Sequence, residues 1–253
     1  MNNFYVNWFL WMYSKPRLVA KWLKRQNNKN SAIGFMKNFV KPGDLVFDVG
    51  ANYGWKTELF LDLGTRIVAI EPQSECVKIL KKKFGSNGAV IIEPVALGSY
   101  ESVAYIRKSD VRNQLSSMSS EWISAVKRSG RFARFEWSSK EKVTVTTLDN
   151  LIAKYGLPAF CKIDTEGYEV EILKGLSQPI AAISLEYHME FLEATRTCIN
   201  NLINLGEYEF NYTVGESPKL QSVRWIDSQE LMVLLSTGLS DKAQGDVYAR
   251  IRT

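Results

Sequence analysis

Segments typical of strands and of helices alternate along most of this chain, and a glycine follows each helical segment. Runs of apolar residues predict strands at 45–49, 66–70, 90–92, 160–163 and 180–185. The stretches between them predict helices at 56–63, 74–84, 148–155 and 168–174, followed by Gly64, Gly85, Gly156 and Gly175. Strands joined through helices run parallel, with right-handed crossovers. We therefore expect an α/β fold in which helices cover a doubly wound, mostly parallel sheet.

Two segments interrupt this alternation. Residues 103–107 and 142–146 predict a pair of extra strands, and the polar stretch 109–140 between them carries four aromatic residues, Trp122, Phe132, Phe135 and Trp137. A long insertion of this kind often forms a lid or contacts substrate, and the aromatic residues argue against a disordered surface loop. We expect one domain at 32–253, beginning with a short helix and carrying 109–140 as an insertion or lid, after an N-terminal helical extension at 1–31.

The N-terminal extension is aromatic and then basic. Large apolar residues crowd positions 4–13, and lysines and arginines follow between positions 15 and 25. The apolar run is too short to span a bilayer and lacks the basic-first order of a signal peptide. Residues 1–30 could therefore lie in a membrane interface, or they could form a helix that packs on the domain or on another subunit. We favour packing, and leave the oligomeric state open.

Composition limits the partners and the compartment. The net charge is +5, and no dense tract of Lys and Arg marks a nucleic-acid groove, so we expect no nucleic-acid partner. The three cysteines, Cys76, Cys161 and Cys198, form no C-x-x-C pair, which indicates neither a disulfide framework nor a zinc site. This cysteine usage suits a reducing compartment, so we expect a cytoplasmic protein with peripheral membrane contact as the alternative.

The first strand runs into a glycine turn, VFDVGANYGWKT at 46–57. In a dinucleotide fingerprint that starts at Gly50, the next glycines would fall at positions 52 and 55, which hold Asn52 and Trp55. The carboxylate of Asp48 beside the turn would also repel a diphosphate. S-adenosylmethionine has no phosphate and carries a positive end that Asp48 can offset. Glu71, at the end of the second strand, can accept hydrogen bonds from both ribose hydroxyls.

Six motifs in order resemble the FkbM-type S-adenosylmethionine-dependent methyltransferases: VFDVGANYG, AIEP, EPVALG, TLDNLI, KIDTEGYEVEILKG and ISLEYH. The resemblance covers about 40–188, with a weaker echo at 245–249, and leaves the N-terminus and the insertion unmatched. It implies the seven-stranded class I methyltransferase sheet, S-adenosylmethionine as cofactor, and O-methylation of small-molecule or glycan hydroxyls.

The resemblance also implies roles for individual residues. The turn residues Asp48, Gly50 and Asn52, with Gly54 of the same motif, are expected to bind the methionine part of the cofactor. Glu71 is expected to bind the ribose. Ala96, together with its two neighbours, is expected to flank the adenine, although these residues could equally be core packing.

The carboxyl ends of the fourth and fifth strands are the expected place for the acceptor. Glu186 and His188 lie two positions apart and therefore point to one side of an extended chain, next to Asp164. We expect His188 to act as the general base, with Asp164 and Glu186 beside it. Alternatively, Mg²⁺ held by Asp164 and Glu186 could acidify the hydroxyl. Glu166 and Glu169 could instead brace the turn and cap the following helix.

Two other function classes stay open at this point. The side chains at positions 52 and 55 argue against a nicotinamide-dependent oxidoreductase, and a cofactor-binding scaffold without catalysis is the third reading. The Asn/Asp-Pro-Pro-Tyr motif of enzymes that methylate amino groups on bases is absent. We therefore expect a hydroxyl acceptor on a sugar, a glycan or a secondary metabolite, whose identity the sequence does not give.

Overall fold

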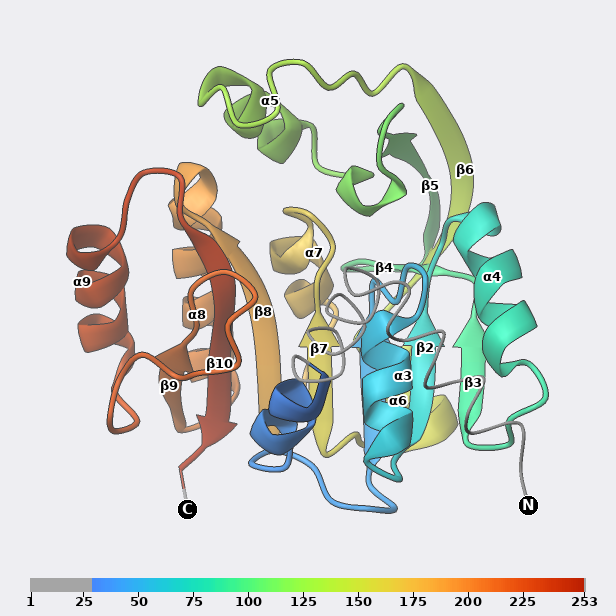
Figure 1. Cartoon of the computed structure of the whole chain (residues 1–253), viewed down its shortest axis with the longest axis horizontal. Coiled ribbons are helices and arrows are strands. Elements are labelled where there is room, and N and C mark those ends of the chain that lie inside the picture. Colours follow the sequence, from blue (N-terminus) through green and yellow to red (C-terminus); the bar gives the residue numbers. More distant parts are fainter. Residues whose placement is uncertain (1–28, 253) are drawn as a thin grey trace, which may run out of the picture.

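The computed structural model describes residues 29–252 and shows a sheet of seven strands. The order across the sheet is β3 (Val90–Glu93), β2 (Arg66–Ile70), β1 (Leu45–Val49), β7 (Phe160–Ile163), β8 (Ala182–His188), β10 (Gln244–Ile251) and β9 (Tyr208–Tyr212). The first five strands are parallel, and β10 is antiparallel to both of its neighbours (Figure 1). This order is that of the class I methyltransferase sheet, so the predicted fold class is confirmed.

Helices cover both faces of the sheet because its strands are apolar on both sides. Residues 29–36, α3 (Trp55–Asp62) and α4 (Ser74–Phe84) pack over one face, on the core that contains Val46 and Phe160. The other face, which contains Phe47 and Ile163, packs against α6 (Leu148–Tyr155), α7 (Glu169–Lys174), α8 (Leu192–Leu205) and α9 (Ser228–Gly238). Alternating residues of one strand thus serve two separate cores.

A second, smaller sheet rises beside the carboxyl ends of the main strands (Figure 1). It contains β4 (Ala96–Leu97), β6 (Ser139–Thr146) and β5 (Ser102–Lys108); β5 and β6 are the predicted pair of extra strands, and they run antiparallel. Between these two strands lie a 3-10 turn, η1 (Asn113–Leu115), and α5 (Ser120–Arg128). The insertion has its own small apolar cluster around Trp122 and Trp137, so it is a folded element rather than surface decoration.

The described structure differs from the sequence predictions in a few places. The strand predicted at 180–185 runs on to His188, and the short helix expected at the start of the domain covers 29–36 within the described residues. Residues 1–28 and 253 lie outside the described residues, and so does nearly all of the predicted N-terminal extension. Within the described range, no helix is both long and apolar enough to cross a membrane.

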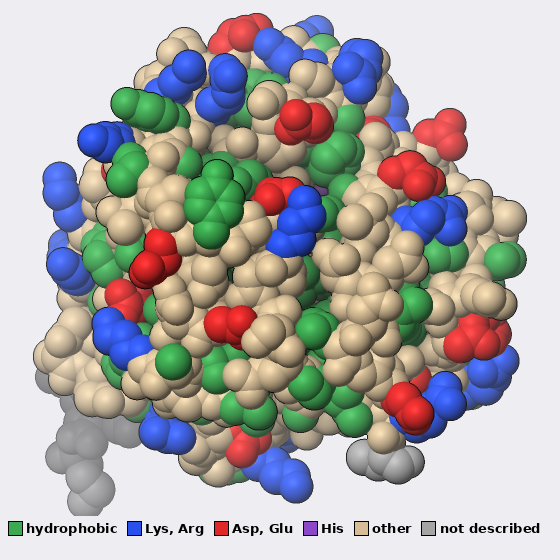
Figure 2. Space-filling view, turned by 180° about the vertical axis from the view of Figure 1, so that it is seen from behind, with side chains coloured by type: hydrophobic (Ala, Val, Ile, Leu, Met, Phe, Trp, Pro, Cys, Tyr) green, Lys and Arg blue, Asp and Glu red, His purple; other side chains and the backbone are tan. Residues whose placement is uncertain are grey.

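The surface carries charges of both signs. Figure 2 shows Lys and Arg side chains around much of the outline of this face, with Asp and Glu side chains scattered among them. The expectation that nucleic acid is not a partner stays a prediction.

Candidate active site

The turn after β1 needs glycine because two strand ends meet there. Gly50 has a φ of +80°, and a Cβ at this position would lie 1.9 Å from the backbone oxygen of Asp164 at the end of β7. Gly54 has a φ of +79° and caps the N-terminus of α3, where a Cβ would lie 2.5 Å from the ring of Phe84. The two glycines therefore allow strands and helices to approach closely. This packing accounts for glycine at positions 50 and 54, which do not follow the spacing of a dinucleotide-binding fingerprint.

A cavity lies next to this turn, and most of the predicted cofactor-binding residues line it. The main sheet contributes Gly50, Asn52 and Glu71 to its lining, and Val95, Ala96 and Leu97 line its apolar side. The insertion closes the cavity with Gln114, Ser116 and Met118. The cavity thus has a polar end near the β1 turn and an apolar end at β4, as an amino-acid moiety and an adenine require.

Glu71 is the buried acid of this cavity, and it is 2% exposed. Its two carboxylate oxygens accept hydrogen bonds from the backbone N–H groups of Asn52 and Gln73, both at 2.8 Å. Burial raises the pKa of Glu71 to about 7, against the lowering effect of those two hydrogen bonds. A carboxylate oxygen can accept more than one hydrogen bond, so both oxygens keep the capacity to bind hydroxyls.

Asp48 and Gly54 were expected beside the cofactor, but neither lines the cavity. The side chain of Asp48 is fully buried on the same face of the sheet as α3, because neighbouring residues of β1 alternate between the faces. One oxygen of Asp48 accepts a 2.6 Å hydrogen bond from the hydroxyl of Thr57, and burial raises the pKa of the carboxyl. Asp48 therefore supports the turn from the α3 side, outside the lining of the cavity.

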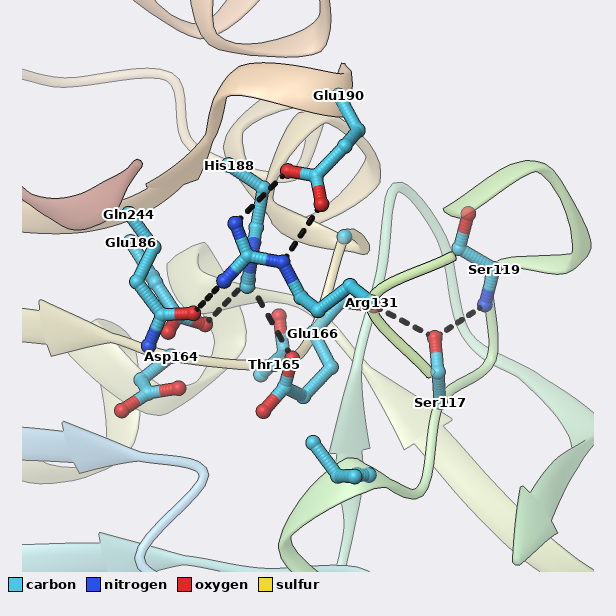
Figure 3. A network of polar contacts seen from close by, with 12 residues as sticks. Ser117, Ser119, Arg131, Asp164, Thr165, Glu166, Glu186, His188, Glu190 and Gln244 are labelled. Carbon is cyan, nitrogen blue, oxygen red and sulfur yellow. Dashed lines mark hydrogen bonds and ion pairs between the residues drawn. The ribbon is translucent and has the colours of Figure 1, made fainter. Parts of the chain in front are cut away.

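Three side chains from two strand ends converge next to this cavity (Figure 3). Nε2 of His188 lies 3.2 Å from a carboxylate oxygen of Glu186 and 3.4 Å from one of Glu166. All three groups are largely buried: the exposed fractions of their side chains are 5% for His188, 15% for Glu186 and 11% for Glu166. Only Glu166 of the three also lines the cavity, so the cluster adjoins its polar end.

The surroundings of His188 do not fit a free histidine base. Burial by itself would lower the pKa of the ring, but the carboxylates of Glu166 and Glu186 raise it to about 10. The ring is therefore protonated at neutral pH unless another cation takes the place of the proton. Trp122 of the insertion covers it edge-on, with 5.5 Å between the ring centroids.

Asp164 lies beside this cluster but is committed to another partner. One of its oxygens accepts a 2.6 Å hydrogen bond from the ammonium of Lys162, a buried residue of β7. Burial would raise the pKa of Asp164, and the charge of Lys162 more than offsets this and lowers it. The predicted ligand pair of Asp164 and Glu186 stays a prediction, whereas the groups whose atoms lie within 4.8 Å of one another are Glu166, Glu186 and His188.

Glu166, in the turn after β7, is a member of the cluster that the sequence analysis did not assign to the site. Glu166 has a φ of +54°, which is uncommon for a residue with a side chain, and this conformation turns its carboxylate toward β8. The bracing considered for Glu166 is done by Glu169, which was considered as the helix cap: its carboxylate accepts from the backbone N–H and the hydroxyl of Thr165, both at 2.9 Å. The sequence signal that could have indicated Glu166 is a glutamate directly before a glycine at the end of a strand.

The insertion is fastened over the cluster at several points. Ser117 donates a 2.6 Å hydrogen bond to the backbone oxygen of Glu166, and the indole of Trp122 fills the space that Gly167 leaves by having no side chain. Arg131 donates to both carboxylate oxygens of Glu190, at 2.6 and 3.0 Å (Figure 3). In this structure residues 109–140 therefore cover the site, consistent with the predicted lid.

A second hollow, of about 480 Å³, lies on the α3 side of the sheet. Its lining includes the aromatic side chains of Phe35, Trp55 and Tyr248 together with the charged groups of Lys56 and Asp246. Burial raises the pKa of Asp246, whereas the charges of Lys56 and Lys162 lower it. Asp246 of this hollow therefore lies near the buried ammonium of Lys162 in β7.

Comparison with known proteins gives a family and several remote likenesses. Residues 48–212 match the family model described as "Methyltransferase FkbM domain". The chain is similar in structure to precorrin-6y C5,15-methyltransferase from Geobacter metallireducens (10% identity, 88% of this chain and 87% of that chain, TM-score 0.44). It is also similar to a putative rRNA-methylase from Clostridium thermocellum (9%, 88% and 95%, TM-score 0.42). A third is a TehB-like SAM-dependent methyltransferase from Corynebacterium glutamicum (8%, 93% and 99%, TM-score 0.40). Comparison with curated protein sequences gives no match.

Proposed function

Because this chain belongs to the FkbM family of S-adenosylmethionine-dependent methyltransferases, we propose that it methylates a hydroxyl oxygen of a sugar, a glycan or a secondary metabolite. The observation that supports an oxygen acceptor is the cluster of Glu166, Glu186 and His188 beside the cofactor cavity. A hydroxyl must lose its proton during methylation, and this cluster contains carboxylate oxygens without a hydrogen-bond donor among the described residues.

The cavity fits S-adenosylmethionine by the chemistry of its lining. Glu71 presents two buried carboxylate oxygens suited to a diol, and Ala96 with its neighbours presents an apolar surface suited to a purine. Gly50 brings backbone, without a side chain, to the polar end. When bound, the cofactor supplies a methyl group on a positively charged sulfur.

The proposed reaction is an in-line displacement. The acceptor oxygen forms a bond to the methyl carbon as the carbon–sulfur bond breaks, and the bonding electron pair stays on sulfur as a neutral thioether. The hydroxyl proton passes to a carboxylate oxygen of the cluster. Most of the rate acceleration is expected from positioning, so the closed insertion that excludes water is part of the proposal.

The second hollow supports a polyhydroxylated acceptor. Its aromatic side chains offer flat apolar surface, and Asp246 with Lys56 offers partners for hydroxyl groups. A ligand bound there would extend from the α3 side toward the buried charges next to the cluster. The nicotinamide-dependent alternative is not retained, because the family is one of methyltransferases and the turn at Gly50 lacks the glycines that a diphosphate needs.

The test is a transfer assay with a donor whose methyl carbon carries an isotopic label. The acceptors are oligosaccharides and hydroxylated small molecules, each paired with its deoxy and its amino analogue, and the labelled product is examined by NMR. The proposal expects label on oxygen, no product from the deoxy analogue, and loss of product in Glu186→Gln. Label on nitrogen or carbon would overturn O-methylation and leave the family assignment untouched.

A further inference from the structure

The cluster of Glu166, Glu186 and His188 has a feature that catalysis by a free base does not explain. Among the residues described, both ring nitrogens of His188 lack a hydrogen-bond partner, and so does one carboxylate oxygen each of Glu166 and Glu186. The ring is 5% exposed, so bulk solvent hardly reaches it. Buried polar groups without partners are costly, and three of them that face one another point to something that they bind together.

The spacing of these atoms matches a shared ion better than hydrogen bonds. The contacts of 3.2 and 3.4 Å from Nε2 of His188 to the two carboxylates do not meet hydrogen-bond geometry. Two ligands bound to one metal at about 2.0–2.2 Å lie roughly 3.0–3.5 Å apart. One atom from each of the three side chains lies within 4.8 Å of the others, so all three can reach one ion with small side-chain rotations.

Among the residues described, the charged groups that face Glu166 and Glu186 are the ring of His188 and the carboxylate of Asp164, and the neighbouring lysine and arginine are paired elsewhere. Lys162 is paired with Asp164 at 2.6 Å, and Arg131 is paired with Glu190 at 2.6 Å. Each of these neighbouring cations thus has its own carboxylate. A divalent ion would balance the two carboxylates of Glu166 and Glu186 while the ring of His188 stays neutral.

We propose that Glu166, Glu186 and His188 form a binding site for one divalent transition-metal ion. An imidazole with two carboxylates suits Mn²⁺, Fe²⁺ or Zn²⁺, whereas Mg²⁺ and Ca²⁺ prefer oxygen ligands alone. Three protein ligands leave positions for an acceptor hydroxyl, which an ion would polarise. This role rests on the proposed O-methylation, but metal binding itself does not.

The experiment uses the untagged full chain, freed of metal with a chelator and then titrated with MnCl₂. Binding is measured from the loss of the electron paramagnetic resonance signal of free Mn²⁺, and calorimetry with ZnCl₂ and MgCl₂ compares the metals. The chain has a single histidine, so its ring gives one set of NMR signals, which bound Mn²⁺ should broaden. We expect one Mn²⁺ or Zn²⁺ per chain, with Mg²⁺ bound more weakly.

Variants distinguish the ligands from their neighbours. Glu186→Gln and His188→Gln should each weaken Mn²⁺ binding by more than about tenfold, and Asp164→Asn should leave it nearly unchanged. Binding of S-adenosylhomocysteine to each variant verifies that it folds. No Mn²⁺ or Zn²⁺ binding at millimolar concentration, or binding that survives His188→Gln, would overturn the site. Metal binding without transfer to oxygen would instead overturn only the proposed function.

Discussion

The pH dependence of cofactor binding tests the role of Glu71. Only the ionised carboxylate can accept hydrogen bonds from both ribose hydroxyls, because the protonated form has to donate one. Burial raises the pKa of Glu71 to about 7, so protonation competes with the ligand near neutral pH. The affinity for S-adenosylhomocysteine should therefore be high above pH 7 and should fall as the pH drops through that value.

The magnitude follows from this pKa. With a pKa of about 7, nearly all of Glu71 is ionised at pH 8 and about a tenth of it at pH 6. The association constant for S-adenosylhomocysteine should then fall about ninefold to tenfold between these pH values, close to the 1.36 kcal/mol that one pKa unit represents. Calorimetric titration at several pH values measures it directly.

Two variants make the test specific. Glu71→Gln should bind more weakly at pH 8, by roughly 1.5–3 kcal/mol for each charge-assisted hydrogen bond lost, and its affinity should no longer depend on pH. Glu101→Gln, on an exposed residue, should behave like the unaltered chain. A flat profile in the unaltered chain would refute the reasoning. So would a slope that persists in Glu71→Gln, because it would point to Glu166, which also lines the cavity and whose pKa burial raises to about 7.

Three further predictions concern stability and the insertion, and urea denaturation checks the first two. Gly50→Ala should lower the free energy of unfolding by about 1–3 kcal/mol more than Gly43→Ala, since both positions have a positive φ but only the first would press a Cβ onto a backbone oxygen; equal losses would contradict this. Thr57→Val should lower the free energy of unfolding by about 1–3 kcal/mol, because it leaves the buried carboxylate of Asp48 without its hydrogen-bond donor. An unchanged free energy of unfolding would mean that Asp48 has another partner. Arg131→Ala should make residues 113–137 more sensitive to protease and raise KM, because its ion pair is largely buried. Arg196→Ala, which removes an exposed pair, should do neither.

Local patterns were sufficient for the elements on which the site is built. The helices Ser74–Phe84 and Leu148–Tyr155 have the predicted bounds, since apolar periodicity defines their length and a glycine follows each. The sequence motifs also placed Glu71 and Ala96 at strand ends, where the structure finds both in one cavity. The bounds of an element and the position of a residue at its end depend on residues nearby in the chain, so one sequence is enough to predict them.

The missed features depend on contacts between distant parts of the chain. Glu166 contacts His188 of the next strand from a backbone with a positive φ, and neither feature follows from the local sequence. Lys162 looked like part of an apolar strand, and its pairing with Asp164 appears only once burial is known. Asp48 points away from the cavity, since strand alternation places it on the other face. No local pattern reports which side of a sheet binds the ligand.

The most direct measurement is a crystal structure of the full chain with S-adenosylhomocysteine. The account predicts ribose hydroxyls within hydrogen-bond distance of Glu71, the adenine against Ala96, and the sulfur directed toward the cluster of Glu166, Glu186 and His188. A ligand bound elsewhere, or one whose sulfur points away from that cluster, would contradict the assignment of the cofactor cavity and of the reacting groups beside it.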